Sequence, residues 1–548
     1  MTTYNTIIIG SGISGIFTLK HLIEEGNTDV LVLDKNPETF GVWNIKNKPS
    51  VFENTHSVSS KLYMTISDFP LPEKTPEFPH HSIILNYYKE YAKHFNLYPY
   101  IKQNVTVYSV EKQNNIWTIK TNNTTYQASY VVIATGTVND CPNIPTDDFY
   151  NHFTGKKYHS DAYEKMKDVE NKKILIVGGS DTMADCAMEL KNKNKVTVSI
   201  KNGAWFQNRN AGAYEPADMF YDRFEDYIVK NVLSKKYVDS YTDHNKINNV
   251  EFWWGESGSG IDIWKSKCDY LNTYYIKSRE IIEQVSKGVI MPENGIKGIN
   301  NKVVTFETNN SDEFDIILFC TGYTPLKCMK FLDDTIVNSP KYKHIFYKDD
   351  PSIIFAGFVR PYLTSIPMLS ELQSRWIASF ICGNVKLPNN SVMEYEIQTD
   401  ITNQEKEFPC ASDRLKTIVD PYDYCNLIAD NIGANVNMFT TFFSNPALAY
   451  MILFDSWNHH IYRLNDKDTE KQKIALENIK NVHSERTSIK TRWFIYYFLV
   501  YYLFCLLLIV IIIIYIYYHY SEIYKFFYGI FYSKRRSYHF AKAFLPKK

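Results

Sequence analysis

The sequence lacks a net charge, a cysteine framework and internal repeats, and each absence narrows the choice of function. Its 60 Lys and Arg residues balance its 60 Asp and Glu residues, so bulk electrostatics favour no nucleic-acid partner. The nine cysteines include no CxxC pair and no Cys/His cluster with zinc-like spacing. We therefore expect reduced cysteines and no structural metal. We expect no signal peptide, because the chain enters the first predicted strand by residue 6.

A glycine-rich motif follows the first predicted strand. It reads Gly10-Ser11-Gly12-Ile13-Ser14-Gly15, and an amphipathic helix continues to about residue 25. Gly10 permits the tight turn from strand to helix, and Gly12 lets the backbone approach a pyrophosphate. Gly15 lets the helix pack closely against the strand, and the free N–H groups at the helix N-terminus favour phosphate binding.

An acid completes this motif at the end of the second strand. The buried run at residues 30–33 ends in Asp34, where a carboxylate can accept hydrogen bonds from a ribose diol. Because strand, glycines, helix and acid follow in the right order, the sequence predicts dinucleotide binding rather than a glycine-rich turn without a ligand.

A second, altered nucleotide motif lies within residues 173–185. Its strand and helix are clear, but Ser180 and Met183 stand where the second and third glycines would be. Lys201 follows the next strand, where a 2′-phosphate would need a cation, and this favours NADP(H) over NAD(H). The alternative is a Rossmann-like domain that has lost its nucleotide.

Two further strands, within residues 130–136 and 315–323, end in small-residue turns. In doubly wound sheets, ligands bind at such carboxyl ends. With 548 residues, the chain exceeds one hydrophobic core. The predicted fold class is α/β, with two Rossmann-like dinucleotide-binding domains, the second inserted in the first, followed by a C-terminal helical region.

A long apolar run lies near the C-terminus. From Trp493 to Tyr518 the chain has no charged residue. As a helix, this run would be about 39 Å long, enough to span a bilayer. We expect a single transmembrane anchor, with the globular part in the cytosol. Basic residues flank the run on both sides, so charge does not orient it.

The segment between the two nucleotide motifs, Phe153 to Tyr163, reads FxGxxxHxxxY. It resembles the identifying motif of flavin-containing monooxygenases, whereas the related Baeyer–Villiger enzymes carry Trp at the last position. Other segments resemble the animal-type, dimethylaniline N-oxide-forming members: SSKLYMTISDFPLP (59–72), KNGAW (201–205), PADMFYDRF (216–224), FCTGY (319–323), PMLSELQSRW (367–376) and NPALAYMILF (445–454). The hydrophobic C-terminus is also similar to their membrane anchor, which in that family lies in the endoplasmic reticulum.

This resemblance implies FAD on the first motif and NADPH on the second. In that family NADPH reduces the flavin, which takes up O₂ as a C4a-hydroperoxide. A soft nitrogen or sulfur nucleophile then attacks the distal oxygen. The implied substrates are therefore O₂ and a small amine or sulfide, and the products are N- or S-oxides. No catalytic side chain is firmly implied, and we favour a structural role for His159 in the domain-linking segment over a catalytic one.

The resemblance also implies which residues contact the cofactors. For FAD they are Gly10, Ser11, Gly12, Ile13, Ser14, Gly15, Asp34, Val42, Trp43, Val58 and Ser59. For NADP they are Ser57, Val58, Gly178, Thr182, Met183, Ala184, Asp185 and Lys201. Four positions depart from the family pattern: Asp34 replaces Glu, Phe40 replaces a Gly, Asp161 replaces an Arg, and Val58 replaces an Asn. The last matters most, because that Asn is expected beside the flavin edge and valine cannot donate a hydrogen bond there.

The predicted parts are an FAD-binding domain over residues 1–165, an NADP-binding domain over 166–320, the returning FAD-binding part over 321–440, a helical membrane-proximal region over 441–492, the anchor over 493–518 and a short basic tail over 519–548. Two alternatives to the monooxygenase remain. Val58 could make the chain an NADPH oxidase that releases H₂O₂. With Ser180 and Met183, Val58 also supports a catalytically silent FAD-binding membrane protein.

Overall fold

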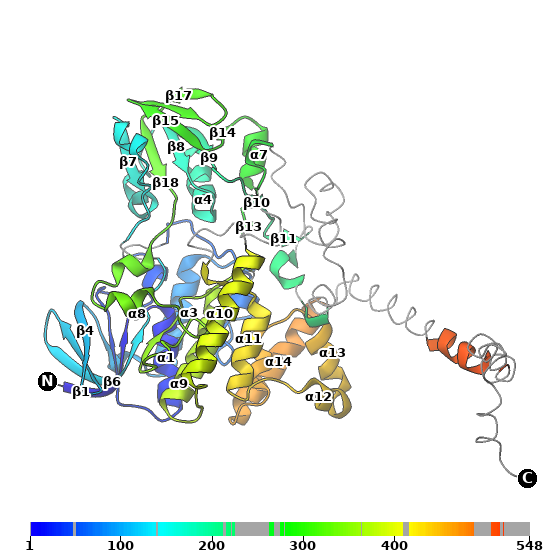
Figure 1. Cartoon of the computed structure of the whole chain (residues 1–548). Helices are drawn as coiled ribbons and strands as arrows, with labels where there is room; N and C mark the ends of the chain where they lie inside the picture. Colours follow the sequence, from blue (N-terminus) through cyan, green and yellow to red (C-terminus); the bar gives the residue numbers. More distant parts are fainter. Residues whose placement is uncertain are drawn as a thin grey trace, which may run out of the picture. The chain divides into compact units, whose positions relative to one another are not determined.

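The computed structural model describes residues 2–47, 51–138, 141–211, 215–220, 222–224, 262–267, 275–278, 280–362, 364–408, 416–486, 506–515 and 519. The chain divides into two units, Met1–Val482 and His483–Lys548. The first unit contains two large sheets, with the second sheet at the top of Figure 1 and the first sheet below it.

The first sheet contains the N-terminal glycine motif. Its strands run in the order β3-β2-β1-β6-β5-β4, and β19 also pairs with β6. Its strands are β1 (Thr2–Ile9), β2 (Val30–Leu33), β3 (Ile101–Lys102), β4 (Val107–Gln113), β5 (Ile116–Thr121), β6 (Thr125–Ile133) and β19 (Ile353–Phe355). Ile9 lies opposite both Leu33 and Ile133 in parallel pairings. The residues that follow these three, including Gly10 and Asp34, therefore meet at one edge of the sheet.

Alternate residues of the central strands enter two different cores. Ile8 and Val32 pack in the core that includes the helices, whereas Ile7 and Leu31 pack in the core on the opposite face. This is why the first strands read as continuous apolar runs. On the helical face, α1 (Ile13–Glu24) packs against α9 (Ile366–Ile381). The hydroxyls of Ser14 and Ser370 lie 2.9 Å apart at this contact.

Apart from the helices of the second sheet, the other α-helices described up to residue 486 mostly follow the sheets in the sequence (Figure 1). They are α2 (Lys61–Met64), α3 (His81–His94), α8 (Asp334–Asn338), α10 (Asn390–Glu407), α11 (Pro421–Asn431), α12 (Met438–Ser444), α13 (Pro446–Phe454) and α14 (Thr469–Arg486). The helical character predicted for the region after residue 441 is thus confirmed.

The second sheet is entirely parallel, in the order β14-β9-β8-β18-β7. Its strands are β7 (Lys156–His159), β8 (Lys173–Val177), β9 (Lys195–Ser199), β14 (Ile290–Glu293) and β18 (Ile316–Phe319), and its helices are α4 (Asp181–Leu190) and α7 (Glu280–Ser286). A three-stranded antiparallel sheet, β15 (Ile296–Asn300), β16 (Val303–Phe306) and β17 (Ser311–Glu313), adjoins it. The chain leaves the first sheet after β6 and returns at β19. The predicted insertion of one Rossmann-type sheet into the other is therefore confirmed.

A buried ionic network joins the C-terminal region to the first sheet. Nη2 of Arg463 lies 3.0 Å from the Asp68 carboxylate and 3.1 Å from the Glu371 carboxylate. Lys20, on α1, forms an ion pair with the same Asp68. The four side chains are at most 2 % exposed. Burial alone would raise the pKa of Glu371, but His459 and Arg463 hold that pKa well below its usual range. The carboxylate therefore stays ionised.

The expectation of reduced cysteines is wrong at one pair. Cys141 and Cys328 form a disulfide, with their Cα atoms 5.9 Å apart. Cys186, Cys320 and Cys425 are buried thiols. The pair was invisible in the sequence because its members are 187 residues apart, and only the meeting of two loops brings them together.

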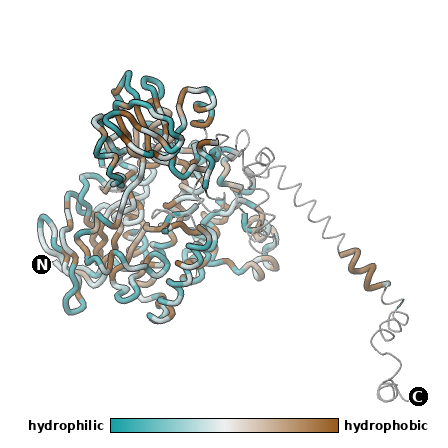
Figure 2. The backbone as a smooth tube through the Cα atoms, turned by 45° about the horizontal axis from the view of Figure 1, so that its top comes forward, coloured by the Kyte–Doolittle hydropathy of each residue, from teal (hydrophilic) through white to brown (hydrophobic). Residues whose placement is uncertain are grey.

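The predicted transmembrane anchor, residues 493–518, lies outside the described residues except for 506–515. These ten are helical, hydrophobic (Figure 2), and each at least 41 % exposed. Among the described residues, no helix is long and apolar enough to cross a bilayer. The anchor therefore stays a prediction, as does the basic tail.

Candidate functional site

The three glycines of the first motif differ in what an added side chain would contact. Gly10 adopts φ +110°, and a Cβ there would collide with the carbonyl oxygen of Ala134. A Cβ on Gly15 would collide with the carbonyl oxygen of Gly10. At Gly12, by contrast, a Cβ would meet nothing within 4 Å. The fold requires the first and third glycines, whereas the second leaves open space beside the N-terminus of α1, where a pyrophosphate would be bound.

Asp34 is turned toward the glycine loop. Its Oδ2 accepts hydrogen bonds from the N–H of Ser11 at 2.6 Å and from the Ser11 hydroxyl at 2.7 Å. Its Oδ1 accepts one from the N–H of Asn36 at 2.8 Å. A carboxylate has about four acceptor positions, so these three bonds leave roughly one for a ribose hydroxyl.

The turn that carries Val42 and Trp43 is hydrogen-bonded to the glycine-rich loop. The N–H of Phe40 donates to the carbonyl of Ser11 at 2.9 Å, and a short 3₁₀ helix, Gly41–Trp43, follows. Phe40 has φ +75°, a backbone conformation that side-chain-bearing residues rarely adopt. Its ring is fully buried and stacks on Tyr88 at 6.3 Å. Burial of the ring offsets the strain that the family's glycine would avoid.

The loop with Ser57, Val58 and Ser59 packs against a distant segment of the chain. The Ser59 hydroxyl donates to the carbonyl of Thr364 at 2.6 Å. The buried hydroxyls of Ser60, Thr135 and Thr364 have no hydrogen-bond partner within the described residues. Buried polar groups are normally paired, so these hydroxyls, together with the open space at Gly12, fit a bound FAD.

The second nucleotide motif keeps its turn despite the lost glycines. Gly178 adopts φ +144°, and a Cβ there would collide with the carbonyl of Cys320. Met183 and Ala184 are fully buried in the core of the second sheet. Met183 is therefore accommodated as a core residue, and α4 still begins at Asp181. The side chains of Thr182 and Asp185 are half-buried, on the same first turns of α4.

Two cations that sequence analysis missed lie beside α4. The N–H of Lys277 donates to Asp181 at 2.7 Å, and Nε of Arg209 donates to the carbonyl of Lys277 at 3.0 Å. Nη2 of Arg209 lies 3.9 Å from the Asp185 carboxylate. Lys201, the predicted phosphate ligand, is exposed just beyond β9. No sequence signal links Arg209 with Lys277, because both lie outside the family-like segments that were recognised in the sequence.

Val58 meets these cations at a small cavity. The cavity is lined by Val58, Gln207, Asn208, Arg209, Ala217, Asp218 and Lys277. The adjacent N–H of Ser60 donates to Asp218 at 2.8 Å. The structure therefore brings the loop of the first sheet together with residues that contact the N-terminus of α4. Gln207 and Asn208, two residues with amide side chains, also line this cavity.

His159 and Tyr163 of the FxGxxxHxxxY segment contact other residues around the second sheet. His159 is 4 % exposed, with Nε2 2.9 Å from the carbonyl of Gly322 and Nδ1 3.1 Å from the Asp161 carboxylate. The Tyr163 hydroxyl donates to Glu189 on α4 at 2.7 Å. These contacts support the structural interpretation of His159.

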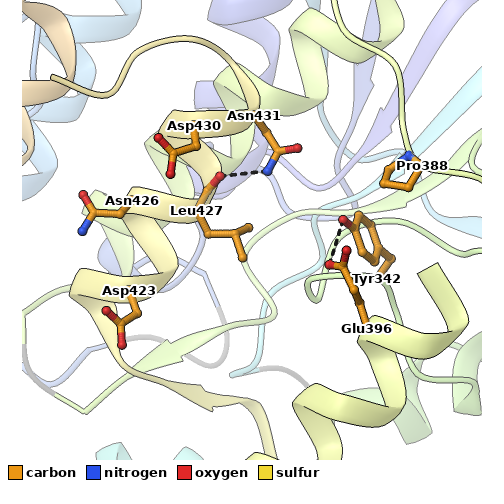
Figure 3. Close-up of a pocket in the computed structure, with 8 residues that line it drawn as sticks. All are labelled: Tyr342, Pro388, Glu396, Asp423, Asn426, Leu427, Asp430 and Asn431. Carbon is orange, nitrogen blue, oxygen red and sulfur yellow. Dashed lines mark hydrogen bonds between the residues drawn. The ribbon is translucent and has the colours of Figure 1, made fainter. Parts of the chain in front are cut away.

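A larger cavity of about 490 Å³ is lined by residues of α10 and α11 together with Tyr342 and Pro388 (Figure 3). Its acids are Glu396, Asp423 and Asp430, and Glu396 accepts a hydrogen bond from Tyr342 at 3.2 Å. None of the predicted cofactor residues lines it.

Comparisons with known proteins agree with this geometry. A family model described as flavin-binding monooxygenase-like matches residues 4–518. Dimethylaniline monooxygenase (N-oxide-forming) 2 of Oryctolagus cuniculus is 29% identical over 483 residues, covering 83% of this chain and 88% of that relative. Flavin-containing monooxygenase 2 of Homo sapiens is 28% identical over the same shares of both chains.

Solved structures share the fold. S-allyl-L-cysteine S-oxygenase from Allium sativum superposes with a TM-score of 0.57 at 19% identity, over 88% of this chain and 99% of that one. Cyclohexanone monooxygenase bound to ε-caprolactone superposes with a TM-score of 0.60 at 17% identity, over 78% and 98%.

Proposed function

The chain belongs to the flavin-binding monooxygenase-like family, and from that membership we propose that it uses NADPH and O₂ to oxygenate soft nitrogen or sulfur nucleophiles. The observation that carries the proposal is the cavity at Val58. There the loop that carries Val58, and that packs against Thr364, meets Arg209 and Lys277, which contact α4 of the second motif. A flavin held by the first sheet and a nicotinamide held by the second would meet at this place.

We propose that the first sheet binds FAD and the second sheet binds NADP(H). The loop at Gly12, Asp34 and the hydroxyls near Ser59 hold FAD, and the first turns of α4 with Arg209, Lys277 and Lys201 hold NADP(H). Bound flavin supplies the redox and oxygen chemistry. The protein's own part is to align the two cofactors and to keep water from the reacting edge.

The test is an anaerobic NADPH titration of the detergent-solubilised protein, followed by admission of air with N,N-dimethylaniline or methyl phenyl sulfide. We expect loss of the flavin absorbance near ~450 nm, then one N- or S-oxide formed per NADPH consumed. Stoichiometric H₂O₂ without oxide would instead identify the oxidase. Flavin that NADPH never bleaches would identify a silent binding protein.

Val58→Asn should raise the coupling of NADPH consumption to product. An amide at this position can donate the hydrogen bond that valine cannot, so H₂O₂ released per NADPH should fall by roughly threefold, as one added hydrogen bond of ~0.6 kcal/mol would give. Val289→Asn, at an exposed position after α7, is the matched control and should change nothing. An unchanged H₂O₂ yield in Val58→Asn would mean that Gln207 or Asn208 already supplies the amide.

NADP⁺ should bind more tightly at pH 6 than at pH 8. Burial raises the pKa of Asp185 to about 7, with Asp181 raising it further and Arg209 opposing both. Above that pKa, the ionised carboxylate repels the nucleotide's phosphates, which should weaken binding roughly threefold. Calorimetric titration of Asp185→Asn should show a smaller pH dependence. The 2′-phosphate titrates identically with both proteins, so equal pH profiles would contradict the placement of NADP at α4.

We propose that the chain is attached to a membrane, with the catalytic part facing the cytosol and the endoplasmic reticulum as the expected site. Residues 493–518 would form the anchor. The first unit supports this proposal with an uncharged stretch, residues 431–454, in which α12 exposes Phe439, Phe442 and Phe443 by 73, 56 and 70 %. Large exposed apolar patches commonly mark membrane or protein contacts.

A chain ending at residue 486 should still bind phosphatidylcholine liposomes weakly through α12. Phe443→Ser should lower the fraction that floats with the liposomes about two- to tenfold, because an exposed phenyl ring entering lipid gains on the order of 1 kcal/mol. Tyr395→Ser, equally exposed at 71 % but on α10, is the control. Equal flotation of the two variants would exclude α12 from the lipid contact.

A further inference from the structure

The polypeptide passes between the two large sheets once in each direction. The outgoing passage joins β6 to β7, and the returning passage joins β18 to β19. Cys141 lies on the outgoing passage and Cys328 on the returning one, and they form a disulfide. This disulfide therefore links the two connections between the sheets. Any movement of one sheet relative to the other would have to bend both connections.

Backbone hydrogen bonds already hold the two passages side by side. The N–H of Asn143 donates to the carbonyl of Gly322 at 2.8 Å, and the N–H of Thr324 donates to the carbonyl of Cys141 at 2.9 Å. Pro142 and Tyr323 form an antiparallel bridge between them. Without the disulfide, this ribbon is a short pair of strands, and isolated two-stranded pairs are marginally stable.

The cysteines of this pair are accessible, unlike most others that the structure describes. Cys141 and Cys328 are both half-buried, whereas Cys186, Cys320 and Cys425 are buried. Small oxidants and thiols attack accessible sulfur much faster than buried sulfur. In a reducing compartment, disulfides are usually transient and redox-sensing.

We propose that Cys141 and Cys328 are a reversible thiol-modification site, oxidised by a hydroperoxide and reduced by a dithiol, which locks the hinge between the two sheets. Its effect on turnover rests on the proposed function, because hydride transfer needs both halves to meet at the Val58 cavity. The disulfide would hold the two passages in one arrangement, and the dithiol form would let the second sheet move.

The chemistry balances with H₂O₂ as oxidant. One thiolate attacks a peroxide oxygen, the O–O bond breaks, and a sulfenic acid and water form. The second thiol displaces the sulfenic oxygen as a second water, which forms the S–S bond. In total, two thiols and one H₂O₂ give one disulfide and two waters. A dithiol reverses the change by two thiol–disulfide exchanges and leaves as its own cyclic disulfide.

The test compares the full-length, detergent-solubilised protein after treatment with H₂O₂ and after treatment with dithiothreitol. Hydrogen–deuterium exchange, read by mass spectrometry, reports on the amides of Asn143 and Thr324 at the ribbon. We expect exchange there at least threefold faster in the reduced protein, with α1 unchanged. Cys141→Ser/Cys328→Ser should match the reduced protein after either treatment, and Cys382→Ser, which removes a half-buried thiol elsewhere, should behave as wild type.

Flavin reduction by NADPH is then timed without oxygen in the same samples. We expect its rate to be at least threefold higher in the reduced than in the oxidised wild type, and equal in the two preparations of the double variant. Ribbon exchange that is the same in both forms, or a disulfide that dithiothreitol cannot open in the folded protein, would overturn the proposed lock. If hydrogen–deuterium exchange at the ribbon differs between the two forms but the rate of flavin reduction does not, the proposed effect of the disulfide on turnover is wrong. Altered exchange in a protein that NADPH never reduces would instead support the lock and reject the proposed function.

Discussion

Gly12→Ala should give a folded protein that is purified without its flavin. Alanine is compatible with the backbone at this position, where φ is −65° and ψ is 175°, and its methyl group would touch no other residue. The methyl group would instead occupy the space where the pyrophosphate approaches the backbone. Overpacking of this kind typically costs about 1–3 kcal/mol, or roughly 5- to 150-fold in the Kd of FAD.

Two measurements separate loss of FAD from loss of the fold. The ratio of flavin to protein absorbance gives the occupancy, and the Tm with and without added FAD reports on folding. Gly298→Ala, which also adds a methyl group in open space, should keep full occupancy. Gly15→Ala should instead damage the fold, because its Cβ would collide with the backbone of Gly10. Full FAD occupancy in Gly12→Ala would place the cofactor elsewhere.

Arg463→Ala should produce the largest loss of stability of any single change to the ionic network. Its guanidinium contacts Asp68, Glu371 and, at 2.8 Å, Asp466. Removing one partner of a buried charge pair typically costs about 3–5 kcal/mol, because the remaining charges are left without compensation in a medium of low dielectric constant. We expect the free energy of unfolding in urea to fall by about that amount.

The matched control is an ion pair at the surface. Lys193 lies 2.5 Å from Glu170, and both side chains are about half exposed (54 and 51 %). Exposed pairs contribute only ~0–1 kcal/mol, so Lys193→Ala should leave the urea midpoint nearly unchanged. Equal effects of the two substitutions would show that water reaches the network around Arg463.

The parts of the fold that depend on local pattern could be predicted from the sequence. The strand at residues 30–33 coincides with β2, because it is apolar on both faces and has an acid at its end. The glycine motif and α1 agree for similar reasons. The strand at 130–136 was placed too late, since β6 starts at Thr125. Its first half is polar on one face, so the sequence showed only the fully buried end.

The second half of the site could not be predicted in the same way. Arg209, Lys277 and Val58 come from three segments, and only tertiary packing brings them to one cavity. The disulfide joins residues 187 positions apart, and the ionic network joins Asp68 to Arg463, 395 positions later. Local sequence patterns do not predict such long-range contacts. Met183 shows that a departure from a local motif need not disturb the fold. It replaces the third glycine of the second nucleotide motif, and the core of the second sheet accommodates its side chain.

The nesting of one sheet inside the other has a consequence for synthesis on the ribosome. β6 cannot pair with β19 until the chain has grown from residue 133 to residue 353, a further 220 residues (353 − 133). At roughly 5–20 residues per second, this takes on the order of 10–40 s. During this time the last part of one edge of β6, at Val131 to Ile133, has no partner strand, and unpaired edges promote aggregation. The inserted second sheet, from β7 to β18, can form within that interval, so we expect it to fold before the first sheet is complete.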